Sequence, residues 1–548
     1  MKQKKLTIGL LCDSLELDEL STYLLKRSEN ISEFEITTII NHNRSRKTSI
    51  DTLYSILRRR GFGYVCRLIG LKCLRLFEGF LLGDRYIPHD IKREDIDLRS
   101  KEIVNTSPIY DNQGYRYTYS DEDIHKIKNL NLDVLIRCSS GVISGELLRV
   151  TPYGILSLHH GDNRKYRGGP AGFWEILNND INTGFIIQKL SENLDAGVIL
   201  CRGSVQTHPL LHANVSRVKK RSYEYMCMTL KNLSYTMDFR EDIYVYESNI
   251  YQLPSCSNII KYFIKTLKYY RTVFSQKFGI LNKKWHVYYK FIDNPDELEL
   301  RLANKLKTKN GEFLADPHII YTNSSYKVLF ENYTKTEGRA KISAIDICRE
   351  TGKLGTVYDL IKEPFHLSFP FSFEHGNQTY LTVESGTRKG IRIYRFLDDG
   401  SVVYHHTILD DAYFADPIIF EYCKFWFLLV NQDTGEVKDF NSELNVYRAS
   451  DPLSGVWTKI SPNGILSGAE NARNAGLIHI GERVFRVNQI QDVHFYGRGF
   501  GLNEVFVSEN GEYSEKRKYT TNYLFPDGIE GIHTLDIKAG LLVYDGYK

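Results

Sequence analysis

The chain has 548 residues and a formal net charge of +4, with 42% apolar and 25% charged residues. This length exceeds what one hydrophobic core holds, so we expect two or three domains. The small charge argues against a nucleic-acid-binding protein, and the sequence has no run of about 18 apolar residues that would span a membrane. The nine cysteines form no Cys-x-x-Cys pair, which disfavours disulfides or a metal site and favours a cytoplasmic location.

The first 205 residues alternate strands with helices. The start "MKQKKLTIGLLCDS" predicts a strand rather than a signal peptide, and "FEITTIINHN", "LDVLIRCSS" and "YGILSLHH" predict further strands. The segments "DELSTYLLKRSE", "SDEDIHKIKNLN" and "SGELLRVTP" predict helices. We therefore expect an α/β, Rossmann-like domain over residues 1–205, with ligands beyond the carboxyl ends of its parallel strands. The first strand lacks a Gly-x-Gly-x-x-Gly loop, which argues against an ordinary dinucleotide site.

Residues 206–283 predict a mainly helical connector. Two basic amphipathic stretches, 54–82 and 258–278, predict helices on the surface. They are either packed helices with solvated Lys and Arg, or a contact with a membrane surface or a lipid-linked substrate.

Residues 284–548 predict an all-β domain built from repeats. The patterns "LADPHIIYTNSSYKVLFEN", "FPFSFEHGNQTYLTVES", "FADPIIFEYCKFWFLLVN", "ARNAGLIHIGERVFRVNQ" and "GIHTLDIKAGLLVYDG" begin near residues 314, 369, 414, 472 and 531. Five repeats of roughly 50 residues, each with four short strands, are typical of a five-bladed β-propeller.

A candidate site follows from the strand "GILSLHH", which ends in His159 and His160. Two histidines at the end of a buried strand add nothing to its packing, but they are useful where the strand ends at a reaction site. Asp195 lies downstream, in the turn of "NTGFIIQKLSENLDAGVILCRG". A carboxylate beside a histidine raises the basicity of the imidazole and fixes its tautomer, so this pair is suited to acid/base chemistry.

Here the chain resembles the folate-dependent formyltransferases, which include sugar N-formyltransferases. Their pattern is Asn-x-His, seven residues and Arg-Gly, then Thr-Gly, and then Leu-Asp-x-Gly-x-Ile-Leu. The matching residues, in the same order, are His159, Arg167-Gly168, Thr183-Gly184 and Leu194-Asp195-Ala196-Gly197-Val198-Ile199-Leu200. The resemblance covers roughly residues 5–205.

The resemblance implies that an amine attacks the formyl carbon of 10-formyltetrahydrofolate. It makes His159 the imidazole that handles the proton and Asp195 its carboxylate. The family Asn, which donates a hydrogen bond to the oxyanion, is replaced by the shorter Ser157. The residues matched to the pterin-facing loops are Gly141, Val142, Ile143, Asn193 and Leu194.

The polar segment after His159 offers substrate-binding candidates, which are His160, Asp162, Asn163 and Arg167. Asn163 or His160 could replace the missing Asn donor. Asp162 could equally be a turn residue, and Arg167 could pair with a local carboxylate. If no donor replaces the Asn, the site is slow, acts on another acyl group, or is inactive.

The predicted propeller carries its own charged residues. Asp316 and Asp416 both stand in Ala-Asp-Pro at the start of a repeat, and other candidates for the central channel are Glu374, Glu384, Arg473, Arg498 and His533. This region resembles arabinanase-like and fructosidase-like glycosidases, and also the N-terminal region of plant glucosamine inositolphosphorylceramide transferases. Structural, sugar-binding and hydrolytic roles stay open for these acids.

Together the two halves predict an enzyme of glycan biosynthesis that formylates the amine of a nucleotide- or lipid-linked amino sugar, while the propeller binds carbohydrate. The expected location is the cytoplasm, with the inner membrane surface as an alternative, and no nucleic acid or metal is expected to take part. One rival hypothesis is a formyltransferase fold that only binds its ligands. Another is a propeller that hydrolyses glycosides.

Overall fold

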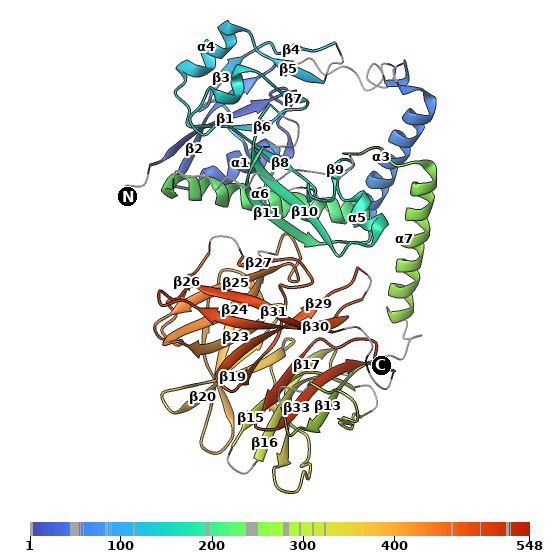
Figure 1. The fold of residues 1–548 in the computed structure, drawn as a ribbon, viewed down its shortest axis with the longest axis vertical. Helices are drawn as coiled ribbons and strands as arrows, with labels where there is room; N and C mark the ends of the chain where they lie inside the picture. Colours follow the sequence, from blue (N-terminus) through green and yellow to red (C-terminus); the bar gives the residue numbers. More distant parts are fainter. Residues whose placement is uncertain are drawn as a thin grey trace. The chain divides into compact units, whose positions relative to one another are not determined.

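The computed structural model describes residues 4–43, 54, 56–58, 60–82, 86, 88, 90–112, 115–192, 197–236, 250–277, 284–294, 298–309, 312–322, 325–433, 435–461, 464–493, 495–521, 525 and 528–548. The chain forms two compact units, Met1–Tyr269 and Tyr270–Lys548 (Figure 1). The predicted boundaries at residues 205 and 283 stay a prediction. Asn193, Leu194 and Asp195 lie outside the described residues.

The first unit is built on a seven-stranded sheet. Its strands are β1 (Leu6–Cys12), β2 (Phe34–Asn41), β3 (Glu102–Asn105), β6 (Val134–Cys138), β8 (Ile155–His159), β10 (Asn182–Lys189) and β11 (Val198–Gln206). They are ordered β11-β10-β8-β6-β1-β2-β3. β10 is antiparallel to β8 and β11, and the other pairs are parallel. The predicted α/β fold is therefore confirmed.

Helices and short strands complete this unit. The helices are α1 (Glu19–Ser28), α3 (Phe62–Leu82), α4 (Asp121–Asn129), α5 (Phe173–Asn178), α6 (Leu211–Thr236) and α7 (Cys256–Lys277), with 3-10 turns η1 (Arg93–Asp95) and η2 (Glu146–Arg149). The short strands are β4 (Ile109–Tyr110), β5 (Arg116–Thr118), β7 (Val142–Ile143), β9 (Arg167–Gly168) and β12 (Ile250–Tyr251). α1 starts where the Asp18 carboxylate accepts from the Ser21 N–H at 2.8 Å, and α4 starts similarly at Ser120.

One predicted helix is wrong. The segment "SGELLRVTP" forms only the four-residue turn η2 before the chain enters β8. Thr151 precedes Pro152, and a residue before proline disfavours the helical conformation, so the turn cannot extend into a helix there.

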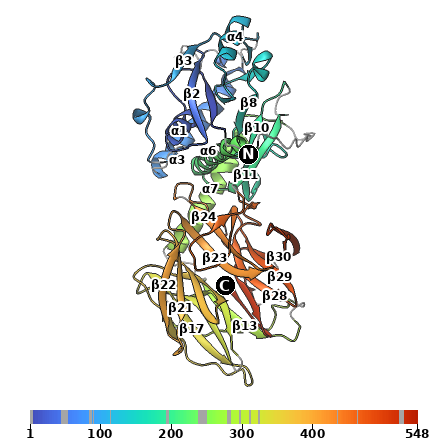
Figure 2. The ribbon, with the colours of Figure 1, turned by 90° about the vertical axis from the view of Figure 1, so that its left-hand side faces the viewer.

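The second unit is a five-bladed propeller, as predicted (Figure 2). The innermost strands are β15 (Glu312–Tyr321), β19 (Ser368–His375), β23 (Tyr413–Tyr422), β28 (Asn474–Ile480) and β32 (Leu535–Lys538). Each contacts the next, and β32 contacts β15, so the ring is closed. The outer strands of the first four blades are β16 (Ser325–Thr334), β17 (Arg339–Cys348), β18 (Tyr358–Ile361), β20 (Gln378–Glu384), β21 (Ile391–Phe396), β22 (Val402–Ile408), β24 (Phe425–Asp433), β25 (Glu443–Ala449), β26 (Thr458–Lys459), β27 (Leu466–Ser467), β29 (Arg483–Ile490), β30 (Gly499–Val507) and β31 (Tyr513–Thr520).

The fifth blade differs from the four-strand repeat that the sequence predicts. The last repeat supplies only β32 and β33 (Leu541–Tyr547), and the blade is completed by β13 (Trp285–Phe291) and β14 (Asn304–Lys305). β13 pairs with β33 along its whole length, from Trp285 opposite Tyr547 to Phe291 opposite Leu541. The first and last strands of the unit therefore share one blade, which leaves neither of them as an unpaired edge in the ring.

Candidate functional site

β8 presents the two residues that the sequence places at the reaction centre. Ser157 and His159 are two positions apart on the strand, so their side chains share one face of the sheet. Ser157 is buried, and its hydroxyl lies 3.4 Å from the carbonyl oxygen of Leu158. His159 is half-buried at the carboxyl end, with Nε2 3.3 Å from the carbonyl oxygen of Tyr166. A Cβ on Gly161 would lie 3.2 Å from that ring nitrogen, so glycine permits this close approach.

The loop that carries Asp195 leaves the sheet opposite the start of β8. Lys189 of β10 pairs with Leu156 and with Val198 of β11, whereas His159 pairs with Ile186. At about 3.3 Å per residue, the base of the loop lies roughly 10 Å from His159 along β8. Asp195 itself lies outside the described residues, so its predicted pairing with His159 stays a prediction.

The described flank of that loop lies beside the segment predicted to face the pterin. The carboxylate of Glu192 accepts a hydrogen bond from the backbone N–H of Gly145 at 3.4 Å. A cavity of about 610 Å³ lies next to this contact, lined by residues 148–152 and 189–192. Its volume is within the range of pockets that hold small ligands.

Gly141, Val142 and Ile143 form the start of a small strand rather than a free loop. Val142 and Ile143 are β7, which pairs in parallel with β5, and the Val142 N–H donates to the Tyr115 carbonyl. Gly141 has φ +90°, and a Cβ there would lie 2.7 Å from the Tyr115 oxygen, so only glycine fits. The segment is thus held at a fixed position beyond the carboxyl end of β6.

The four substrate-binding candidates do not form one group. The ring of His160 packs against α6, where its Nε2 lies 3.1 Å from the Ser222 hydroxyl, and burial lowers the pKa of His160 to about 3. Asp162 and Asn163 do lie together. Arg202 of β11 lies within 3.5 Å of the Asp162 carboxylate and donates to Asn163 Oδ1 at 2.7 Å. Arg202 could not be predicted from the sequence, because nothing in its own segment indicates that it binds Asp162 and Asn163.

The fourth candidate, Arg167, lies on β9. This strand pairs with β12, and a Cβ on Gly168 would lie 2.3 Å from the Tyr251 carbonyl oxygen. The glycine of the Arg-Gly pair therefore allows the backbones of β9 and β12 to approach each other closely.

A second polar cluster, also missed, lies where β1, β2 and β6 end. Asp13 accepts from the Ser140 N–H and hydroxyl at 3.0 and 2.7 Å, and lies 3.5 Å from His42 Nδ1. His42 Nε2 is 2.5 Å from the Tyr119 hydroxyl. Burial opposes ionisation of Asp13, but His42 and Ser140 outweigh it and lower its pKa. Because ligands of parallel sheets bind at this edge, the cluster is a candidate contact for a substrate.

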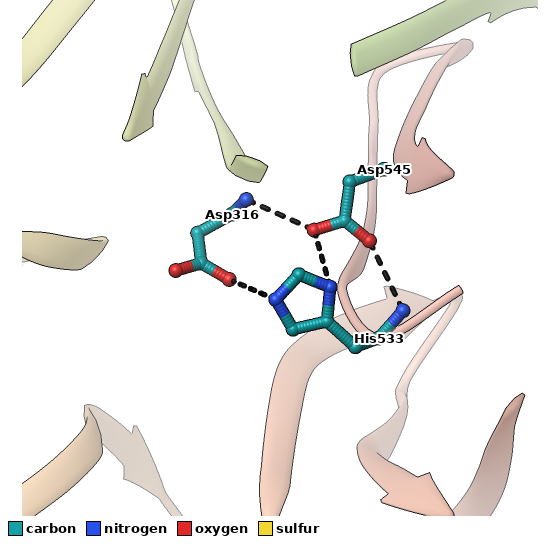
Figure 3. A group of neighbouring side chains, drawn as sticks. All are labelled: Asp316, His533 and Asp545. Atoms are coloured by element: carbon teal, nitrogen blue, oxygen red, sulfur yellow. Dashed lines mark hydrogen bonds and ion pairs between the residues drawn. The ribbon is translucent and has the colours of Figure 1, made fainter. Parts of the chain in front are cut away.

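The propeller centre contains a buried His533 between two carboxylates (Figure 3). Nε2 lies 3.1 Å from Asp316 Oδ1, and Nδ1 lies 2.8 Å from Asp545 Oδ2. Burial disfavours the charged ring, but Asp545 and Asp316 outweigh it and raise the pKa of His533 to about 10. His533 is therefore an imidazolium that joins the first and fifth blades.

This trio is the one group of described residues with the composition of a metal site. Its geometry is that of an ion-pair clamp instead. The carboxylate of Asp545 also accepts from the backbone N–H groups of Asp316, His533 and Thr534, each at 3.0 Å. A cation would have to displace these donors and the imidazolium, so we assign no metal here.

A second ion cluster lies at the start of the third and fourth blades. Arg473 donates from Nε to Asp416 Oδ2 at 2.6 Å and lies 3.8 Å from Glu384. Burial, followed by the charge of Asp416, raises the pKa of Glu384 well above its usual range. Tyr496 is 42% exposed, yet its ring lies over the Arg473 guanidinium at 5.3 Å and near His533. An exposed aromatic face above paired charges is suited to a sugar ring, whose apolar face stacks while its hydroxyls bond.

The backbone at these positions is strained. Asp316, Phe369 and Asp416 have φ of +51°, +44° and +49°, and each stands at a register shift in its innermost strand. Positive φ in residues other than glycine costs free energy and concentrates at functional sites. The three residues stand at equivalent places in consecutive blades, so the strain is a property of the ring centre.

The remaining two channel candidates, Glu374 and Arg498, are not part of these two ion clusters. Glu374 is at the far end of β19 from Phe369, where it lines a separate cavity of about 360 Å³ to which all five innermost strands contribute. The guanidinium of Arg498 lies over the ring of Phe495 at 5.8 Å. Asp316, Glu384, Asp416, Arg473 and His533 therefore make up the polar centre, and Asp545 is an addition that the sequence analysis missed.

Comparison with known families finds a match for the propeller region. Residues 302–522 match the family model described as "Glucosamine inositolphosphorylceramide transferase 1, N-terminal". The match includes Asp316, Glu384, Asp416 and Arg473 but ends before His533. Glucosamine inositolphosphorylceramide transferase 1 from Oryza sativa subsp. japonica is 27% identical over 211 residues, which cover 37% of this chain and 28% of the relative.

The formyltransferase likeness is also found among curated proteins. Methionyl-tRNA formyltransferase from Clostridioides difficile (strain 630) is 32% identical over 109 residues, which cover 20% of this chain and 34% of the relative. The chain thus spans about a third or less of the length of these relatives.

Solved structures show distant likenesses. Glycinamide ribonucleotide transformylase 1 from Symbiobacterium toebii matches with 12% identity and a TM-score of 0.28, over 44% of this chain and 95% of that chain. A thermostable family-43 glycoside hydrolase matches with 14% identity and a TM-score of 0.29, over 39% and 78%. At such TM-scores they add no argument to the folds described above. The sequence relatives nevertheless confirm both resemblances: a formyltransferase-like α/β unit is joined to a propeller similar to the N-terminal region of glucosamine inositolphosphorylceramide transferases.

Proposed function

We propose that the first unit transfers the formyl group of 10-formyltetrahydrofolate to the amine of a nucleotide- or lipid-linked amino sugar in glycan biosynthesis. The propeller binds the carbohydrate part of a substrate or product of the same glycan biosynthesis. The two family likenesses support a transferase of this class, since one is to a formyltransferase and the other to a transferase of glucosamine.

One observation carries the proposal: residues that flank the two segments matched to the family's pterin site are in contact beside a cavity. The contact between Glu192 and Gly145 joins the flank of the Asp195 loop to the segment after β7. The adjoining cavity of 610 Å³ is of the size that a bicyclic ring needs, and it is lined by residues that precede β8 and by residues at and after the end of β10.

The fixed position of Gly141, Val142 and Ile143 beyond the carboxyl end of β6 supports this cofactor, which would supply the formyl carbon when bound. Gly141 to Ile143, with Asn193 and Leu194, would hold its pterin. His159 accepts the proton that the attacking amine loses, and Asp195 orients its imidazole. Ser157, on the same face of β8, donates a hydrogen bond to the oxygen on which negative charge develops.

In this proposal, the cluster of Asp13, His42 and Tyr119 binds the amino-sugar acceptor. It adjoins Gly141 through Ser140, so a group bound there lies next to the predicted pterin segment. Its hydroxyl, imidazole and carboxylate are suited to the hydroxyls of a sugar or ribose.

The test is a formyl-transfer assay with 10-formyltetrahydrofolate and a panel of UDP- and dTDP-linked amino sugars. We expect turnover with at least one acceptor and its loss in His159→Ala, with unchanged folate binding by calorimetry. A chain that binds folate but transfers no formyl group would instead support the rival binding module. Full turnover in His159→Ala would refute the mechanism.

A propeller that hydrolyses glycosides is the second candidate. Glu384, whose pKa is raised well above its usual range, lies beside Asp416, which is paired with Arg473, and two neighbouring carboxyl groups in different environments are typical of acid/base catalysis. Against it, both oxygens of Asp316 and of Asp416 already accept hydrogen bonds from protein groups. Hydrolysis of chromogenic glycosides that is lost in Asp316→Asn would favour this candidate over carbohydrate binding alone.

A further inference from the structure

The outward faces of α3 and α7 are apolar. The exposed apolar side chains that form these faces are Phe62, Cys66, Ile69, Cys73, Leu76, Phe77 and Phe80 on α3, and Ile260, Phe263, Ile264, Leu267, Tyr270 and Phe274 on α7. Within each helix they recur at spacings of three, four and seven residues, so each set forms one stripe. Phe80 is 85% exposed and Leu267 is 64% exposed, whereas the exposed face of an ordinary surface helix is polar.

The opposite faces of the same helices are packed into the first unit. Leu71 and Leu74 of α3 and Tyr262 of α7 belong to one buried cluster with Leu211 of α6. The buried Glu78 of α3 accepts hydrogen bonds from the Tyr262 hydroxyl and from the His212 backbone. The helices are thus fixed by their inner faces, and the stripes are not a consequence of loose packing.

The charges around the stripes have one sign. α7 contains five basic residues and no acidic residue, and Glu78, the single acidic residue of α3, points inward. Lys72, Lys261 and Arg271 are exposed along the helices. An apolar stripe flanked only by positive charge matches the interface of an anionic bilayer, where apolar groups enter the acyl region and Lys and Arg meet phosphates.

We propose that α3 and α7 dock the first unit onto an anionic lipid bilayer, lying in its interface. Among the described helices, none is long and apolar enough to cross a membrane. A second copy of the chain is a poorer occupant, because pairing these faces would set basic residues against basic residues. The inference goes beyond the proposed function and does not depend on it.

Co-sedimentation of the full chain with vesicles tests the proposal. The wild type should bind vesicles of phosphatidylcholine and phosphatidylglycerol in a two-to-one ratio, and should bind pure phosphatidylcholine far less. Phe80→Ser with Leu267→Ser should weaken binding by roughly tenfold or more per side chain. Lys72→Gln with Lys261→Gln and Arg271→Gln should weaken it by on the order of 100-fold and reduce its salt dependence.

Leu302→Ser is the matched control, because Leu302 of the propeller unit is 85% exposed and lies outside both helices. It should bind vesicles like the wild type. Equal melting temperatures of all variants show that the fold is kept, since every changed side chain is exposed. The proposal is overturned if the wild type ignores anionic vesicles, if the stripe variants bind unchanged, or if light scattering finds a dimer that these variants dissociate.

Discussion

At the scale of single residues, the proposed function predicts that Ser157 sets the rate of the reaction. It stands where the formyltransferase pattern has Asn, and its hydroxyl has a weak contact at 3.4 Å to a neighbouring carbonyl. If this hydroxyl donates to the developing oxyanion, Ser157→Ala should lower kcat by about 100- to 1000-fold and leave KM nearly unchanged. Steady-state kinetics of the two proteins measure the split. A kcat that stays within a factor of two would assign the donor to another group.

His533 links pH to the stability of the propeller. Its pKa of about 10 in the fold exceeds the roughly 6.5 of an unfolded histidine, so its contribution is complete below pH 6.5 and is lost as pH rises through 10. The contribution is on the order of a few kcal/mol. We expect the urea midpoint of the propeller to fall between pH 7 and pH 10 by more in the wild type than in His533→Gln. Fluorescence is a suitable probe, since the ring of Trp285 packs against that of His533 with the centroids 4.0 Å apart.

Parallel pH profiles of the two proteins would contradict this assignment. The comparison with His533→Gln is needed because Lys, Tyr and Cys side chains also titrate in that range.

At the scale of elements, β33 holds the ring closed. Leu542 and Val543 are adjacent residues of this strand, and both are fully buried. They belong to two different hydrophobic clusters, so the strand packs on both of its faces against neighbouring blades. Leu542→Ala should lower the free energy of unfolding of the propeller by about 2–5 kcal/mol. Leu302→Ala, at an exposed site, should change it by less than about 0.5 kcal/mol. Urea unfolding followed by tryptophan fluorescence compares the two, and equal midpoints would contradict the closing role of β33.

The sequence predicts those elements that local pattern determines. β1, β2, β6 and β8 follow from alternating apolar runs, and the five innermost propeller strands follow from the repeat. Local pattern does not reveal partners that are distant in sequence. The pairing of β13 with β33 spans almost the whole second unit, and its register depends on ring closure.

The same limit applies to the candidate site. His159 and Ser157 could be predicted because the motif lies within one strand. Asp13 and His42 could have been suspected, since each follows a strand of a parallel sheet, but their contact depends on the strand order. Arg202 carries no local signal, and the pairing of Asp195 with His159 stays a prediction, because Asp195 lies outside the described residues.

At the scale of the whole molecule, two units with separate cores are expected to unfold separately. The first contains a sheet packed by helices and one tryptophan, Trp174, whereas the second contains three, Trp285, Trp426 and Trp457. A single free energy of unfolding does not describe such a chain, so ligand effects must be assigned to individual transitions.

The proposed function predicts which transition a folate moves. A ligand that binds only the folded first unit stabilises it by about 2.7 kcal/mol at a concentration of 100 Kd. For a unit of this size, that corresponds to a rise in Tm of about 5–10 °C. Scanning calorimetry with 5-formyltetrahydrofolate should therefore raise the melting temperature of the first unit and leave that of the propeller unchanged. Tryptophan fluorescence, dominated by the propeller, identifies the second transition. A folate-induced shift of the propeller alone would place the folate site in the second unit, and a shift of neither unit would contradict folate binding.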